Sequence, residues 1–149
     1  AIAGFGAAAA TAAKQAESSR MARLRDRFEA GLKAVVPEAV IFGAGAPRLP
    51  NTTLFAIPGM KAETAVIAFD LNGIAVSSGS ACSSGKVQPS HVLAAMGVEP
   101  LIAQGAVRVS LGWSTSEREV DNLLSALTKV SSFLLKSHEN SRSKSGLAA

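Results

Sequence analysis

The chain has 149 residues, 48% of them hydrophobic, and a formal net charge of +4. This length and apolar content suffice for one domain with its own core, and no apolar run is long enough to cross a membrane. One cysteine and two histidines exclude an internal disulfide framework and a clustered structural zinc site. We therefore expect a cytoplasmic protein, and the modest charge does not favour nucleic-acid binding.

The chain begins with AIAGFGAAAATAAK, which lacks an initiator methionine and is typical of the interior of an alanine-rich helix. No basic segment precedes it, so it is not a signal peptide. From Ala16 to Val36 apolar residues recur at helical spacing, and Pro37 ends this helix. We interpret the opening residues as part of a chain that was cut from a longer protein.

Three short strands and one helix are predicted next. Residues 61–72 form the helix, with Gly73 as its C-terminal glycine. The strands have the sequences AVIF, NTTLFAI and IAVS, at residues 39–42, 51–57 and 74–77. The third strand leads directly into the serine-rich stretch SSGSACSSGK.

Beyond that stretch, PSHVLAAMG (89–97) predicts a short helix with Pro89 in its first turn. AVRVSL (106–111) alternates as a strand does. Ser116 and Glu119 have the spacing of a capping box, which predicts the start of the last helix.

The last helix has one apolar stripe, formed by Val120, Leu123, Leu124, Leu127, Val130 and Leu134. From Ser137 the chain lacks apolar anchors, so residues 137–149 are predicted to be a disordered tail. Residues 1–136 then form an α/β domain of the α+β type. We expect its helices to pack on a small, largely antiparallel sheet.

The only cysteine, Cys82, lies in the stretch 77–86, whose serines and glycines favour a loop over a packed element. A phosphate-binding loop is excluded because five residues, not four, separate Gly79 from Gly85. In addition, Val87 stands where that motif needs a hydroxyl for magnesium.

A cysteine hydrolase with His91 as its base has little support, because no oxyanion-hole or orienting motif accompanies that histidine. Two interpretations of Cys82 remain open from the residues alone. One is an inert thiol in a surface loop. The other is a mobile nucleophilic thiol that collects a group from a substrate and hands it to a partner.

Arg108 lies on the predicted strand 106–111. Val107 and Val109 should face the core, so Arg108 and Ser110 should face the other way. A guanidinium suits a planar carboxylate because it makes two parallel hydrogen bonds. A structural ion pair is the alternative for Arg108.

Several segments together resemble the C-terminal part of class I cysteine desulfurases, which are pyridoxal-phosphate enzymes of fold-type I. They are LPNTTLFAIPG, GIAVSSGSACSSG, PSHVLAAMG and AVRVSLGWSTSEREVDNLL. The resemblance extends from Ile2 to about Val130. It implies that the chain is the small C-terminal domain, in which residues 1–36 are the helical connection from a missing large domain. Asn51 and Trp113 lie in the matching segments, and neither is assigned a role.

The resemblance also implies an activity, the conversion of L-cysteine to L-alanine. Cys82 matches the residue that takes the sulfur as a persulfide, and Arg108 matches the residue that binds the substrate carboxylate. The persulfide then passes to an iron–sulfur scaffold or another sulfur acceptor. In some members the cysteine is also a ligand of a transient iron–sulfur cluster. A homodimer is expected for the full-length enzyme.

The lysine that holds pyridoxal phosphate in this family follows a histidine in the large domain, and it has no counterpart here. No lysine of the chain has that context: Lys14, Lys33, Lys61, Lys86, Lys129, Lys136 and Lys144. We therefore expect the fragment to be inactive alone. The alternative function is a non-catalytic module that docks a partner and carries sulfur or a metal on Cys82.

Overall fold

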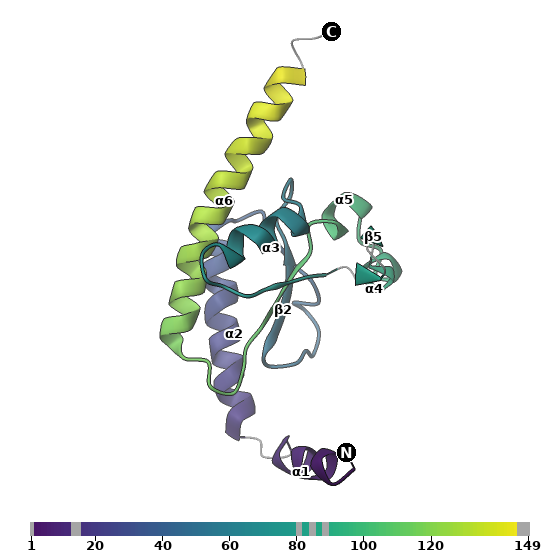
Figure 1. Cartoon of the computed structure of the whole chain (residues 1–149), viewed down its shortest axis with the longest axis vertical. Coiled ribbons are helices and arrows are strands. Elements are labelled where there is room, and N and C mark those ends of the chain that lie inside the picture. Colours follow the sequence, from purple (N-terminus) through teal and green to yellow (C-terminus); the bar gives the residue numbers. More distant parts are fainter. Residues whose placement is uncertain (1, 13–15, 80–81, 84–85, 88–89, 146–149) are drawn as a thin grey trace.

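The computed structural model describes residues 2–12, 16–79, 82–83, 86–87 and 90–145. Helices α2, α3 and α6 lie together on one side of a small sheet, and α6 runs along α2 (Figure 1). Helix α1 lies beyond the N-terminal end of α2, away from the sheet (Figure 1). The bounds of these helices are Ile2–Ala12 for α1, Ala16–Val35 for α2, Ala62–Asp70 for α3 and Glu117–Ser145 for α6.

The main sheet has four short antiparallel strands in the order β1-β2-β6-β3. Strands β2 and β6 form its centre, with Thr52 opposite Ser110 and Phe55 opposite Val107. This arrangement confirms the predicted fold of helices on a small, largely antiparallel sheet. The strands are β1 (Val40–Ile41), β2 (Thr52–Ala56), β3 (Ser77–Ser78) and β6 (Val107–Ser110).

The main core lies between the three helices and the face of the sheet turned toward them. Phe28 of α2 and Phe55 of β2 meet edge to face, with ring centroids 5.8 Å apart. Val107 and Val109 are buried on this side, whereas Arg108 and Ser110 are exposed on the other. The alternation predicted for this strand is therefore confirmed, and Arg108 points away from the core.

Two short helices cover one end of the opposite face. They are α4 (His91–Ala95) and α5 (Pro100–Ala103). A second, smaller cluster of buried side chains lies beneath them and consists of Phe42, Ala56, Leu93, Ala103 and Ala106. The sequence interpretation did not include α5, although a proline in the first turn is its usual signal.

Both helix-end signals are confirmed. The backbone N–H of Ser116 donates to the Glu119 carboxylate at 2.7 Å, and the Glu119 N–H donates back to the Ser116 hydroxyl at 3.3 Å. This reciprocal pair begins α6. At the end of α3, Gly73 has φ of 75°, a left-handed conformation that glycine adopts without strain.

The third strand differs from the one predicted. It comprises Ser77–Ser78 rather than residues 74–77. Ile74 and Val76 instead pack against the main core, and their segment borders a cavity that Val109 and Leu111 also line. Pairing begins only at Ser77, beyond that cavity.

The helix after the serine-rich stretch begins at His91, with Ser90 as its cap. The Ser90 hydroxyl accepts a hydrogen bond from the backbone N–H of Leu93 at 3.3 Å. The helix therefore starts after Ser90 rather than with Pro89 in its first turn, as predicted, and Pro89 itself lies outside the described residues. A side-chain acceptor at the cap satisfies a backbone donor that a proline start would leave unpaired.

The predicted tail is corrected over residues 137–145, because α6 continues to Ser145, whereas residues 146–149 lie outside the described residues. No glycine or proline occurs between Gly112 and Gly146. Once a helix has formed, adding residues of moderate propensity costs little, so composition alone does not end it. The boundary at residue 136 has no counterpart in the backbone. Within the described residues, no helix is long and apolar enough to cross a membrane.

A half-buried charged cluster joins the loop before β2 to helix α2. Arg48 donates to both carboxylate oxygens of Glu29, at 2.7 and 2.9 Å, and the Thr53 hydroxyl donates to one of them at 2.7 Å. Burial alone would raise the pKa of Glu29, but the hydrogen bonds from Arg48 and Thr53 hold that pKa below its ordinary value of 4.5.

We expect Glu29→Gln to lower the free energy of unfolding by about 2 kcal/mol near neutral pH, because the amide loses charge-assisted hydrogen bonds. The folded pKa of Glu29 is depressed, so its contribution is complete above the unfolded pKa and is lost as the pH falls through the folded one. Denaturant unfolding should show a difference in the free energy of unfolding between wild type and Glu29→Gln that is constant above about pH 5.5 and shrinks in acid.

The matched control is Glu38→Gln, since Glu38 is exposed and makes no side-chain hydrogen bond among the described residues. Its effect on the free energy of unfolding should be small. A deficit of Glu29→Gln that persists unchanged in acid would show that packing, rather than charge, holds the loop.

Candidate functional site

The part of the sheet face that α4 and α5 leave uncovered carries Arg108 at its centre. Arg108 lies directly opposite Leu54 on one side and Ser77 on the other. Residues directly opposite in antiparallel strands point to the same face, so these three side chains form a row across the sheet. Thr52 and Ser110 face each other one step further along. The result is one cation surrounded by hydroxyl groups and one aliphatic side chain.

Arg108 makes no side-chain hydrogen bond or ion pair within the described part of the chain, and it is exposed. The structural ion pair considered for this position is therefore not formed there. By contrast, Arg48 is held by Glu29, and Arg27 donates to Asp121 at 2.8 Å. Arg108 retains a complete guanidinium for an anionic ligand.

The segment that carries Cys82 begins beside this arginine. Ser77 pairs with Arg108, Ser78 pairs with Val107, and the N–H of Gly79 donates to the carbonyl oxygen of Ala106 at 2.6 Å. Three residues later, Cys82–Ser83 (β4) pairs with Lys86–Val87 (β5) in a second, two-stranded sheet. The stretch was predicted to be a loop, and these two short strands are an addition to that interpretation.

The side chain of Cys82 lies outside what the structure describes, so its contacts are not part of the site geometry. Chain length nevertheless limits its position. Three residues of extended chain span at most about 11 Å, so the backbone of Cys82 stays within that distance of Gly79. The structure therefore brings the start of the cysteine segment and Arg108 to the same edge of the sheet.

The structure also shows the positions of His91, Asn51 and Trp113. His91 is the exposed first residue of α4. The Asn51 side-chain amide donates to the carbonyl oxygen of Leu111 at 3.2 Å. Trp113 is 80% exposed, and its carbonyl accepts a hydrogen bond from Arg20 of α2. These bonds join β2 and α2 to the chain that follows β6.

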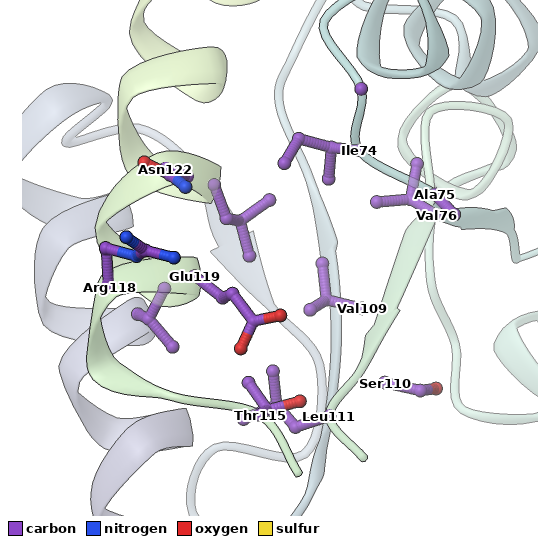
Figure 2. Close-up of a pocket in the computed structure, with 13 residues that line it drawn as sticks. Ile74, Ala75, Val76, Val109, Ser110, Leu111, Thr115, Arg118, Glu119 and Asn122 are labelled. Carbon is purple, nitrogen blue, oxygen red and sulfur yellow. The ribbon is translucent and has the colours of Figure 1, made fainter.

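A cavity of ≈ 440 Å³ lies between the start of α6, the end of β6 and residues 73–76 (Figure 2). Glu119 extends into it from the helix, while Thr115 lies at its lower end (Figure 2). The Glu119 carboxylate is already used to cap α6, and this holds its pKa below the ordinary value. Neither Arg108 nor Ser77 lines this cavity, so it is not the candidate site.

The described residues do not fit a pyridoxal-phosphate site. Lys33 donates to the carbonyl oxygens of Pro37 and Ala39, in the chain that follows helix α2. Lys61 and Lys129 are exposed and border shallow surface cavities that offer no aromatic ring or histidine to stack on a cofactor. No group of His, Cys, Asp or Glu in the described ranges could hold a metal ion.

The sequence pattern of the aminotransferase class-V family matches residues 1–123, and the chain belongs to that family. Among curated proteins it is 43% identical to a cysteine desulfurase of Azotobacter chroococcum mcd 1, over 81% of this chain and 31% of that relative. It is also 42% identical to the cysteine desulfurase NifS of Azotobacter vinelandii, over 83% of this chain and 31% of that protein.

Among solved structures, a NifS-like protein from Rickettsia africae ESF-5 superposes with a TM-score of 0.74. It is 35% identical and covers 87% of this chain and 33% of its own. The chain therefore spans about a third of the length of the relatives it matches. This likeness confirms the predicted resemblance and the fold class, whereas the activity of a whole desulfurase remains a proposal for this chain.

Proposed function

We propose that this chain is the part of a cysteine desulfurase that accepts the sulfur and binds the substrate carboxylate. In this proposal L-cysteine is the substrate and L-alanine the product. Cys82 receives the sulfur as a persulfide and passes it to an iron–sulfur scaffold or another sulfur-acceptor protein. The complete enzyme is a cytoplasmic homodimer, and the helices and sheet described above form one of its domains.

One observation carries the proposal. Arg108, exposed and without an ion pair in the described residues, lies directly opposite Ser77, where the Cys82 segment begins. A carboxylate on the guanidinium would place the rest of a small amino acid within reach of a thiol whose backbone is tethered within about 11 Å of Gly79. A structural arginine or an inert thiol would not require this juxtaposition.

The sulfur transfer balances without an added oxidant or reductant. The sulfur of Cys82 bonds to the sulfur of the substrate while the substrate's carbon–sulfur bond breaks. The carbon keeps that electron pair and takes a proton, which gives L-alanine and leaves a persulfide on Cys82. The described residues do not fit pyridoxal phosphate, so activation of the carbon–sulfur bond belongs to the enzyme beyond this chain. The role of Arg108 is to orient the substrate.

We expect this chain alone to release no alanine from L-cysteine and to form no saturable complex with pyridoxal phosphate, because the lysines that the structure describes lack a cofactor site. The complete enzyme should release alanine and sulfur in equal amounts. Absorbance titration with the cofactor and chromatographic assay of alanine test both statements. Saturable, lysine-dependent cofactor binding by this chain would contradict the first, and alanine release without sulfur transfer would contradict the second.

A further inference from the structure

The point where the cysteine segment leaves the main sheet is unusually tight. A Cβ atom placed on Gly79 would lie 2.7 Å from the Cβ of Ala106, 3.1 Å from its carbonyl oxygen and 3.2 Å from Cδ1 of Leu54. Facing Cβ atoms of an antiparallel pair are normally about 4.5–5.5 Å apart. Side-chain-bearing residues do not reach such distances, so only glycine allows this approach.

The obstacle is rigid. The methyl group of Ala106 is attached directly to the backbone, and Ala106 is fully buried beneath α4 and α5. Strand β6 is in turn held by β2 along Val107–Ser110, whereas β3 pairs with it over only two residues. Any added bulk at Gly79 would therefore displace the β3 edge and leave β6, with Arg108, in place.

We propose that Gly79 is a positioning residue that fixes the start of the Cys82 segment beside the Arg108 site. This inference rests on the proposed function and adds a residue to it. Gly79 donates a hydrogen bond to Ala106 and lies close against it, so Gly79 is the fixed end of the chain segment that carries Cys82. The other end, Ser90 at the cap of α4, is eight residues from Cys82 and limits the thiol far less. The shorter connection, from Gly79 to Cys82, therefore determines how far the thiol can lie from Arg108.

The test substitutes Gly79→Ala in the complete enzyme and measures persulfide formation on Cys82 as a function of L-cysteine concentration. A misplacement of about 1 Å can cost about 100-fold in rate. We expect kcat to fall about 10- to 100-fold while KM stays within about threefold, because Arg108 does not move. Partial unfolding would also lower the apparent kcat at unchanged KM, so kcat is expressed per mole of folded enzyme.

Two further variants make the test specific. Ala106→Gly removes the nearest of the three atoms that the new Cβ would meet, and the remaining contacts at 3.1 and 3.2 Å need shifts of only a few tenths of an ångström. The double variant with Gly79→Ala should therefore recover kcat to within about threefold of Ala106→Gly alone. Gly45→Ala is the matched control, since no atom lies within 4 Å of its added Cβ. It should behave as wild type.

Amide hydrogen exchange supplies a readout that does not require activity. In wild type the Gly79 N–H should be protected from exchange. In Gly79→Ala the N–H of residue 79 should exchange at least about tenfold faster, and in the double variant it should regain protection. Unchanged kinetics in Gly79→Ala, or a defect or unfolding that Ala106→Gly does not relieve, would overturn the proposal. If wild type forms no persulfide, the proposed function fails, and the exchange data alone decide the role of Gly79.

Discussion

Cys82→Ser should abolish persulfide formation in the complete enzyme, because a hydroxyl cannot accept a sulfur atom as a stable persulfide. Serine has nearly the shape of cysteine, so the fold and the cofactor absorbance should not change. The measurement is mass spectrometry of the peptide that contains residue 82 after a single turnover with L-cysteine. Wild type should gain one sulfur atom on this peptide, and the variant should gain none.

Ser83→Ala is the matched control, since it alters the neighbouring residue of β4 and keeps the thiol. It should retain persulfide formation. Native wild type should also react with a small thiol reagent nearly as fast as unfolded protein, as expected of an accessible nucleophile. If sulfur appears on another residue while Cys82→Ser remains active, Cys82 is an inert thiol.

Arg108→Ala should raise the L-cysteine concentration needed for half-maximal desulfuration by at least about 30-fold. Loss of one partner of a bidentate charge pair costs about 2–5 kcal/mol, which corresponds to about 30-fold or more in affinity. Arg108→Lys should recover only part of this loss, because an ammonium group cannot make two parallel hydrogen bonds. The measurement is the desulfuration rate against L-cysteine concentration for wild type and both variants.

Arg118→Ala is the control for loss of one exposed positive charge, and it should leave that concentration dependence unchanged. Arg118 lies on α6 beside the cavity of Figure 2 and makes no side-chain hydrogen bond among the described residues. Cofactor absorbance and the reactivity of Cys82 should remain normal in every arginine variant. An unchanged curve for folded Arg108→Ala would assign Arg108 a structural role.

Local patterns in the sequence predicted most elements because the responsible interactions lie within a few residues. Helical spacing placed α2, the Ser116–Glu119 pair placed the start of α6, and Gly73 placed the end of α3. Strict alternation around Arg108 predicted its exposed side chain. The serine-rich stretch predicted an accessible thiol, and this remains a prediction because the Cys82 side chain is outside the described residues.

The structure differs from the prediction at three elements, each for a separate reason. Strand β3 pairs with β6 from Ser77 onward, and no local pattern encodes where two distant segments begin to pair. Helix α6 continues past Ser137 because nothing in its backbone stops it, although its composition resembles a tail. Helix α5 is only four residues long, which is too short for a periodic pattern.

The sequence by itself determined the family resemblance, the candidate nucleophile Cys82 and the outward direction of Arg108. Only the tertiary structure decided that Ser77 lies opposite Arg108 and that Gly79 approaches Ala106 too closely for any side chain. The physical reason is strand register. Which residues face each other across a sheet depends on pairing between segments about thirty residues apart, and a shift of one residue would turn every side chain to the opposite face.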